Sequence, residues 1–198
     1  MKSIMISIKP EWVAKILNGE KILEIRKSMP KCELPCKVYI YETKGKILIG
    51  EHFERSKSKE NLYFGGKAKY ITKKDYYFGK GKIVAEFTLN KIDLLIDCGF
   101  GIHYVDTNYN DLDLDYLTIN SCLTDEKIYL YLGLRKNSGY YNDGYAWHID
   151  DLKIYDKPKN LNKFSTILHR MKGKESRFTS HLLQRPPQSW CYVEEERK

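Results

Sequence analysis

The sequence predicts a single α+β domain in which a small, partly closed β-barrel is flanked by a few helices. Short segments with alternating apolar and polar residues, typical of β-strands, recur along the chain, whereas helical spacing of apolar residues occurs in only a few places. The 198 residues contain no internal repeat and no convincing linker. We therefore expect one domain over residues 1–198, with a basic insertion at 55–82 and a second basic segment at 162–185.

A strand and a short helix open the chain. Residues 3–8 (SIMISI) place three isoleucines on one face and Ser and Met on the other, which predicts a strand. Pro10 suits the first position of a helix, and the apolar residues of KPEWVAKILNGE recur at helical spacing. Gly19 is the candidate for the left-handed residue that ends this helix.

Strands dominate the remainder of the chain. The sequence predicts them at residues 22–27, 37–43, 45–51 and 82–95, with one or two more within 144–156 and a last one within 186–195. A tight turn at Lys44-Gly45 joins the second and third of these strands. Alternate residues from Ile83 to Leu89 form one apolar face.

Two further helices are predicted. One begins after Thr124, whose hydroxyl can cap it, and ends near Gly133. The other is a short helix around Phe164–Met171. Residues 106–117 are expected to form an acidic connection.

Composition and charge limit the classes of function. The formal net charge of +8 favours a polyanionic partner, most simply nucleic acid. No stretch approaches the ~20 apolar residues that a membrane span needs, and Lys9-Pro10 interrupts the apolar run that a signal peptide requires. The five cysteines are odd in number and lack a disulfide-scaffold pattern, which suits a reducing compartment. We therefore expect a soluble cytoplasmic protein with no membrane partner.

The basic segment 55–82 interleaves lysines with aromatic residues. It contains nine Lys or Arg against two acids, and it is predicted to be a partly ordered insertion that could contain a short hairpin. Lysines hold phosphates without sequence preference, and tyrosines stack on unpaired bases at ~1–3 kcal/mol each. The alternative is a solvated charge run in a lysine-rich sequence. The candidate nucleic-acid contacts here are Lys67, Lys69, Tyr70, Lys73 and Lys74.

The stretch GEKILEIRK concentrates charge at a helix-to-strand turn. Strand alternation places Glu24 and Arg26 on one face, with Lys21 in the turn itself. One interpretation is a surface Glu24–Arg26 pair on an edge strand, worth ~1 kcal/mol or less. The other is a site in which Lys and Arg hold a phosphate or a base while Glu sets their protonation.

The segment SIKPEWVAKILNGEKILEIRKSMP resembles the start of an ASCH domain, a member of the PUA-like superfamily. In that family a strand leads into a helix that ends in Gly-x-Lys, followed by a strand with Glu or Thr and Arg. The segments KVYIYET, GKIVAEFTLNKI, GYAWHIDDLKIYDKP and PPQSWCYVEE fit the rest of the pattern. The two basic segments have no counterpart in it.

The resemblance implies a small β-barrel with a cleft near the first helix and the Gly-x-Lys turn. The family is associated with RNA binding, and some members are hydrolases. One branch deacylates N4-acetylcytidine with a Lys in this turn, a Thr three residues later and a remote Glu. By position the Lys is Lys21, but Glu24 occupies the Thr position. The hydroxyl nucleophile is therefore absent, and Glu24 could instead act as a general base on water.

RNA or nucleotide binding in this cleft is the function that we expect. The candidate binding residues outside the insertion are Lys9, Arg26, Lys27 and Trp190. The first alternative is a hydrolase, of amidohydrolase or ribonuclease type, whose catalytic candidates are Lys21, Glu24 and His148.

A third function, with less support, is that of a phage or other mobile-element protein that inhibits a nucleic-acid machine by binding another protein. Cys32 and Cys36, with Cys191, could bind zinc if a histidine joined them, but idle thiols are favoured and no metal is expected. Phosphate-binding glycine loops and dinucleotide fingerprints are absent, so no cofactor is expected. The sequence leaves the oligomeric state open.

Overall fold

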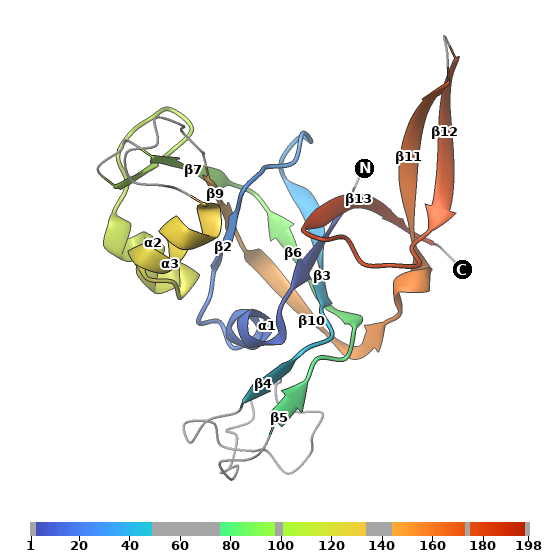
Figure 1. Cartoon of the computed structure of the whole chain (residues 1–198), viewed down its shortest axis with the longest axis horizontal. Coiled ribbons are helices and arrows are strands. Elements are labelled where there is room, and N and C mark those ends of the chain that lie inside the picture. Colours follow the sequence, from blue (N-terminus) through green and yellow to red (C-terminus); the bar gives the residue numbers. More distant parts are fainter. Residues whose placement is uncertain (1–2, 49–75, 98–100, 134–143, 173–174, 197–198) are drawn as a thin grey trace.

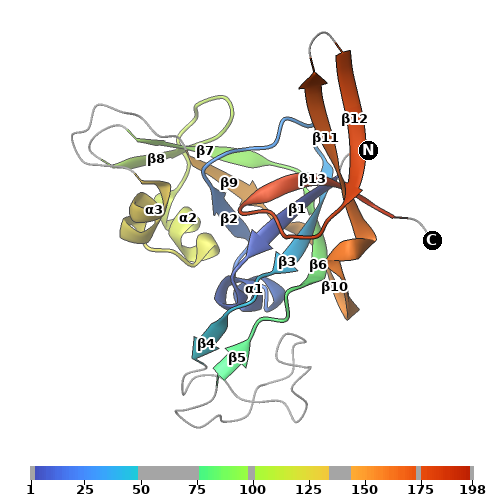
Figure 2. The same ribbon diagram turned by 45° about the vertical axis from the view of Figure 1, so that its right-hand side comes forward.

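The computed structural model describes residues 3–48, 76–97, 101–133, 144–172 and 175–196 of the chain. These form a mixed α+β fold whose sheets curve around a common core without closing completely, as Figure 1 and Figure 2 show. The elements, in order, are β1 Ser3–Ile8, α1 Pro10–Leu17, β2 Leu23–Arg26, β3 Cys36–Glu42, β4 Lys46–Leu48, β5 Tyr76–Phe78, β6 Lys82–Leu89, β7 Ile92–Asp97, β8 Ile102–Val105, α2 Leu114–Ser121, α3 Asp125–Leu132, β9 Gly144–His148, β10 Asp150–Lys159, η2 Leu161–Lys163, β11 Phe164–Lys172, β12 Glu175–Leu182 and β13 Trp190–Glu195.

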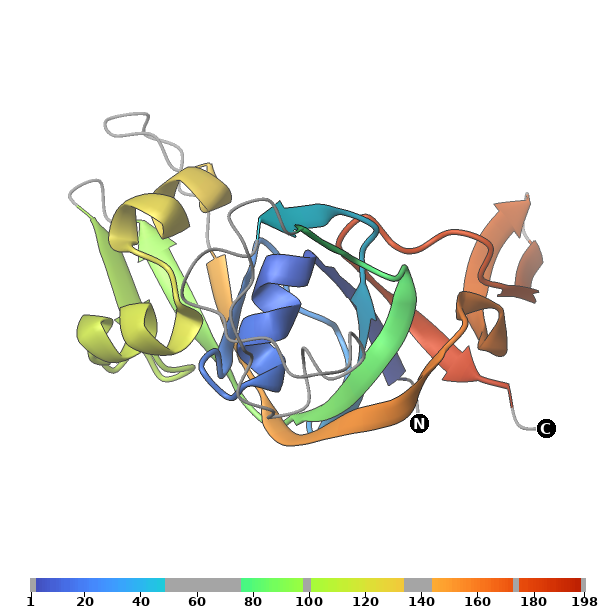
Figure 3. The ribbon, with the colours of Figure 1, turned by 90° about the horizontal axis from the view of Figure 1, so that it is seen from below.

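Two sheets make up the barrel. The larger has the strand order β10-β6-β3-β1-β13-β11-β12, and the smaller has the order β2-β9-β7-β8. Seen from below, α1 lies across the opening between the sheets (Figure 3), while α2 and α3 lie beside the smaller sheet. The strands β4 and β5 form a separate pair next to α1. The predicted fold class is confirmed.

The first strand is buried on both faces, although its alternating pattern predicted only one apolar face. Ile4, Ile6 and Ile8 join the barrel core with residues of α1. Met5, on the other face, packs in a second cluster that includes Phe164 of β11. β1 therefore lies at the centre of the large sheet, between β3 and β13.

The first helix begins and ends as predicted. Pro10 occupies its first turn, where a missing backbone N–H costs nothing. Gly19 follows the helix at φ +75°, and the N–H of Glu20 donates to the carbonyl of Lys15 at 2.9 Å. This pairing, together with the bond from Gly19 N–H to Ile16 O, is the Schellman motif that reverses the chain towards β2.

Four predictions about secondary structure were wrong, one of them altogether and three in part. The expected strand at 82–95 is two strands, β6 and β7, because the chain turns at Asn90-Lys91 and passes from the large sheet to the small one. The turn at Lys44-Gly45 does not join a hairpin, since β3 pairs with β1 and β6 while β4 pairs with β5.

The other two incorrect predictions concern helices. The expected helix at Phe164–Met171 is strand β11, which pairs with β12 along its length. The acidic connection at 106–117 runs into helix α2, whose first turn is capped by the Asp113 carboxylate accepting from the Asp115 N–H. The helix after Thr124, the strands at 144–156 and the last strand are as predicted.

Each described α-helix has eight residues. Within the described residues, no helix is long and apolar enough to cross a membrane.

Replacing Gly19 by Ala tests the helix end that orients the Lys21 turn. No atom lies within 4 Å of an added Cβ, so the cost comes from the positive φ alone. We expect Gly19→Ala to lower the free energy of unfolding by ~1–2 kcal/mol, measured by urea denaturation. The matched control is Gly45→Ala, whose Cβ makes only an ordinary contact with Pro10 at 3.6 Å. Equal effects of the two substitutions would contradict the left-handed role of Gly19.

Candidate functional site

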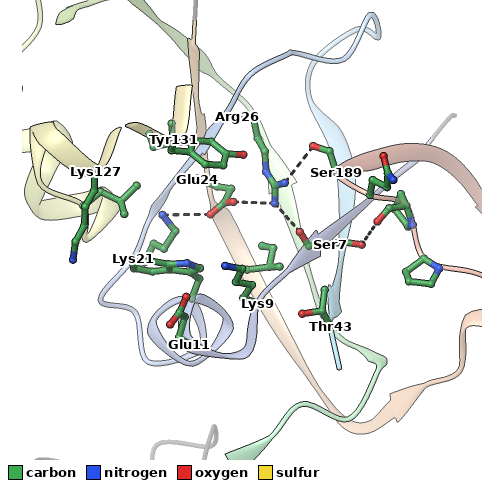
Figure 4. A pocket seen from close by; sticks show the side chains of 17 residues that line it. Ser7, Lys9, Glu11, Lys21, Glu24, Arg26, Thr43, Lys127, Tyr131 and Ser189 are labelled. Carbon is green, nitrogen blue, oxygen red and sulfur yellow. Dashed lines mark hydrogen bonds and ion pairs between the residues drawn. The ribbon is translucent and has the colours of Figure 1, made fainter. Parts of the chain in front are cut away.

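A pocket of ≈ 700 Å³ lies between α1, β2, α3 and the loop that precedes β13 (Figure 4). Its walls include the apolar side chains of Ile8, Trp12, Ile25 and Leu123. Its polar and charged side chains are Ser7, Lys9, Glu11, Lys21, Glu24, Arg26, Thr43, Lys127, Tyr131, Gln188 and Ser189.

Two of the charged side chains that line this pocket belong to strand β2. It pairs with β9 in a register that places Glu24 opposite Trp147 and Arg26 opposite Tyr145. Trp147 is fully buried in the barrel core. Since directly paired residues share a face of a sheet, Glu24 and Arg26 point to the barrel side of β2, as the sequence predicted for the two of them together.

Lys21 is buried, and two backbone carbonyls and one carboxylate surround its ammonium group. Its Nζ donates to the carbonyls of Leu23 at 2.7 Å and Ser121 at 2.8 Å, and it lies 3.3 Å from Glu24 Oε2. Ser121 is the last residue of α2, where the helix dipole and carbonyls that have no hydrogen-bond partner within the helix favour a cation. Lys21 therefore holds α2 against the turn and fixes the position of the Glu24 carboxylate.

Arg26 holds the other oxygen of the same carboxylate. Its Nη2 lies 2.9 Å from Glu24 Oε1 and donates to the carbonyl of Ser7 at 2.9 Å. Its Nη1 donates to Ser189 Oγ at 3.3 Å (Figure 4). The buried Nε has no hydrogen-bond partner among the described residues. The side chains of Lys21, Glu24 and Arg26 are 2%, 9% and 7% exposed, so one carboxylate faces two cations away from bulk water.

Two aromatic rings contribute to the pocket wall. The Lys21 Nζ lies 5.6 Å from the centre of the Trp12 ring. The Tyr131 side chain reaches from α3 towards Arg26 (Figure 4), and burial raises the pKa of its hydroxyl, with Arg26 opposing and Glu24 reinforcing the shift. Lys127 and Tyr131 are four residues apart on α3 and so share one helix face, a spacing by which the sequence could have indicated them.

The loop before β13 closes one side of the pocket. Ser7 anchors it twice: its N–H donates to the carbonyl of Ser189 at 2.9 Å, and its Oγ donates to the carbonyl of Pro187 at 2.6 Å. Sequence reasoning missed Ser7 and Ser189, because their roles depend on a contact between the two ends of the described chain.

His148 does not line this pocket. Its neighbour Trp147 is the residue opposite Glu24, and successive strand residues point to opposite faces. The His148 Nε2 instead lies 2.7 Å from Asp93 Oδ2 on β7. The structure therefore separates His148 from the Lys21–Glu24–Arg26 cluster, and we leave it out of the proposed site.

The remaining predicted site residues are placed as follows. Lys9 lines the pocket and is exposed. Lys27 Nζ lies 5.6 Å from the centre of the Tyr131 ring. Trp190 is partly buried, packs on Trp147 of the core with ring centres 5.9 Å apart, and does not line the pocket. The candidates of the basic insertion, Lys67, Lys69, Tyr70, Lys73 and Lys74, lie outside the described residues.

Two of the three cysteines considered for zinc lie together, Cys36 at the start of β3 and Cys32 in the loop before it. Their sulfur atoms are 3.5 Å apart, and burial, followed by the hydrogen bond with Cys32, raises the pKa of Cys36 to about 12. Among the residues that the structure describes, no group of three His, Cys, Asp or Glu side chains could hold a metal ion.

Asp93, the buried partner of His148, makes the stability of the smaller sheet depend on pH in a way that can be tested. Asp93 is fully buried and contacts His148 at 2.7 Å, Tyr104 Oη at 2.7 Å and Lys91 Nζ at 2.9 Å. Burial alone would raise the pKa of Asp93, but the hydrogen bonds from His148, Lys91 and Tyr104 outweigh it and the pKa is lowered. The ionised carboxylate therefore stabilises the fold above its unfolded pKa of ~3.9, and this contribution is lost as the pH falls through the lower folded value.

We expect Asp93→Asn to destabilise the protein most at pH 5–7. Its difference from the wild type in unfolding free energy should shrink as the pH falls below ~4. Urea denaturation at pH 6, 4 and 3 measures this, with the exposed Asp156→Asn as the control. A difference that stayed constant with pH would contradict the role given to the Asp93 charge.

Comparison with known proteins identifies similar folds. No family model matches this chain, and no curated protein matches it in sequence. The structure is similar to the crystal structure of ASCH from Zymomonas mobilis, with 16% identity over 98% of this chain and 88% of that chain and a TM-score of 0.48. Two mutant structures of the same protein also match. One has 14% identity over 98% and 89% of the chains with a TM-score of 0.48, and the other has 16% over 81% and 77% with a TM-score of 0.42.

Proposed function

We propose that the pocket beside α1 binds a nucleotide, either free or as one unit of an RNA strand. One observation carries the proposal: the Glu24 carboxylate is fixed between two buried cations in a concave pocket with aromatic side chains in its wall. The volume of ≈ 700 Å³ is within the ~300–1,000 Å³ of small-molecule sites. The sequence resemblance to ASCH domains, which are associated with RNA binding, agrees with this function.

The polar groups suit the edge of a nucleobase. A carboxylate has about four acceptor positions, so the contacts with Lys21 and Arg26 leave capacity on Glu24 for a donor of the ligand. The unpartnered Nε shows that the hydrogen-bonding capacity of Arg26 is not used up by the described residues. An acceptor beside a donor is the pattern that reads an amino group next to a ring nitrogen or carbonyl, as in cytosine.

The charge of the pocket suits a phosphate. Four cations and two carboxylates line it, which leaves a formal excess of two positive charges. Lys9 and Lys127 are exposed and can contact a phosphate that remains partly in water. Trp12 and Tyr131 offer ring faces on which a base can stack.

Removing one ring tests nucleotide binding directly. We expect Trp12→Ala to weaken the affinity for the best-bound nucleoside monophosphate by about five- to 150-fold, since a stacked base is worth ~1–3 kcal/mol. Isothermal titration with the four common ribonucleotides identifies that ligand and gives its dissociation constant. The control is Tyr109→Ala, which removes a 70% exposed aromatic side chain outside the pocket. Failure of the wild type to bind any nucleotide would overturn the proposal.

A hydrolase is the second candidate, favoured by the fixed geometry of Glu24. Both of its oxygens are held, at 2.9 Å and 3.3 Å, so the carboxylate could orient a water molecule and accept its proton. Arg26 could stabilise the negative charge that develops when this water attacks an amide or a phosphodiester. Lys21 donates to two backbone carbonyls and is ion-paired with Glu24, which gives it a positioning role and not that of a nucleophile.

Glu24→Gln separates the two candidates. If the protein is a hydrolase of N4-acetylcytidine or RNA, this variant should lose turnover by at least about 100-fold while retaining ligand binding. The control is Glu11→Gln, which changes an exposed carboxylate of the same pocket. Circular dichroism of each variant is needed, because Glu24→Gln leaves two buried cations without their counter-charge. Binding without turnover in the wild type would leave nucleotide binding as the function.

A further inference from the structure

Two cysteines lie side by side where the chain enters β3. Cys36 is the first residue of β3, and Cys32 lies four residues earlier, in the loop that follows β2. Their Sγ atoms are hydrogen-bonded at a distance of 3.5 Å. A disulfide needs an S–S distance of ~2.05 Å, so a closing movement of ~1.5 Å would join them. Neither cysteine lines the pocket, so the pair is separate from the proposed nucleotide site.

Hydrogen bonds to β13 hold the loop that carries Cys32. The N–H of the preceding residue, Lys31, donates to Tyr192 Oη at 2.7 Å. Earlier in the same loop, Ser28 Oγ accepts from Trp190 Nε1 at 3.0 Å. Cys32 thereby packs against the barrel core, in which its partner is buried. The fold therefore brings the two thiols together, which their spacing in the sequence does not show.

The two thiols differ in their access to solvent. Cys32 is partly exposed, whereas Cys36 is 3% exposed. Burial, followed by the hydrogen bond with Cys32, raises the pKa of the Cys36 thiol to about 12. The thiolate is the reactive form of a cysteine, and it must be accessible to its reagent. An external reagent would therefore react first at Cys32, and Cys36 would react second, with the sulfur beside it.

The segment between the two cysteines can follow the closing movement. Residues 33–35 are all exposed. Cys36 is fixed by strand pairing, opposite Leu89 of β6. Formation of a disulfide would therefore move Cys32 and the exposed residues beside it, and would leave β3 in place.

We propose that Cys32 and Cys36 form a reversible disulfide by exchange with a low-molecular-weight disulfide such as oxidised glutathione. The Cys32 thiolate attacks one glutathione sulfur, the glutathione S–S bond breaks, and one glutathione leaves as a thiolate that takes up the proton lost by Cys32. The deprotonated Cys36 sulfur then attacks Cys32 Sγ and displaces the second glutathione in the same way. Two protein thiols are thus oxidised while one glutathione disulfide is reduced to two thiols. This modification site goes beyond the proposed function and does not depend on it.

One tryptic peptide reports on both thiols. Cleavage after Lys31 and Lys37 releases residues 32–37, CELPCK. The folded protein is incubated with oxidised glutathione at pH 8 and quenched with acid, and its free thiols are alkylated before digestion and mass spectrometry. We expect this peptide to be unalkylated and lighter than its reduced form by two hydrogen atoms. Treatment with dithiothreitol should restore two thiols that can be alkylated.

Single substitutions separate the two steps. Cys36→Ser should stop the reaction at the mixed disulfide, so that glutathione stays bound to Cys32. Cys32→Ser leaves only the buried thiol of the pair, which should react with glutathione at least about tenfold more slowly than Cys32 does. The control is Cys122→Ser, which removes a partly exposed thiol at the end of α2. Its disulfide yield at residues 32–37 should stay within about twofold of the wild type, since the sites are independent.

A comparison with the unfolded chain isolates the contribution of the fold. The equilibrium constant of the pair with glutathione should be at least about tenfold larger in the native protein than in protein unfolded by concentrated urea, because the fold holds the thiols close together. Equal constants would overturn the inference, as would recovery of the 32–37 peptide with both thiols alkylated, or a disulfide from either thiol to another cysteine of the chain. If Cys36→Ser fails to fold, the wild-type peptide and this comparison decide between the outcomes.

Discussion

The rest of the structure depends on how one buried carboxylate is neutralised. Glu24 lies between Lys21 and Arg26, and each cation is also bound to a different part of the chain. Lys21 contacts the carboxyl end of α2, and Arg26 contacts β1 and the loop before β13. Buried charges are tolerated only when paired and hydrogen-bonded. The residues that shape the pocket are therefore also the residues that join its walls, so the proposed binding would use the same contacts that stabilise the fold.

This arrangement also leaves the pocket with a surplus of positive charge. A cluster designed only for stability would match one cation to one anion, or would be replaced by apolar side chains. Here a second cation is retained beside a concavity with an unpartnered buried Nε, among the described residues. The local field is thus suited to a negatively charged or strongly polar ligand.

Local patterns in the sequence were sufficient for most of the fold. The helix from Pro10 to Leu17 and the face shared by Glu24 and Arg26 follow from spacing, because helices and strands repeat with fixed periods. Residues 82–95 were predicted as one strand because an apolar alternation does not show on which sheet each half lies. β11 was predicted to be a helix because its strand structure depends on pairing with β12, which the local sequence pattern does not show.

Part of the proposed site could also be predicted, because three of its residues are close together in the sequence. Lys21, Glu24 and Arg26 lie within six residues of each other, so the turn indicates them together. His148 was included among the catalytic candidates, whereas the register of β9 against β2 places Trp147, and not His148, opposite Glu24. Ser7 and Ser189 are 182 positions apart and become neighbours only through the pairing of β1 with β13.

That pairing has a consequence for the order of assembly. β1 precedes both β3 and β13 in the chain but lies between them in the sheet, so one of its edges stays open until β13 has been synthesised. Long-range pairings of this kind form slowly, because loop closure must precede any gain from contact. The pocket wall at Pro186–Ser189 arrives with the same strand. Until β13 is made, the chain would therefore expose the edge of a buried strand and would lack one wall of the pocket.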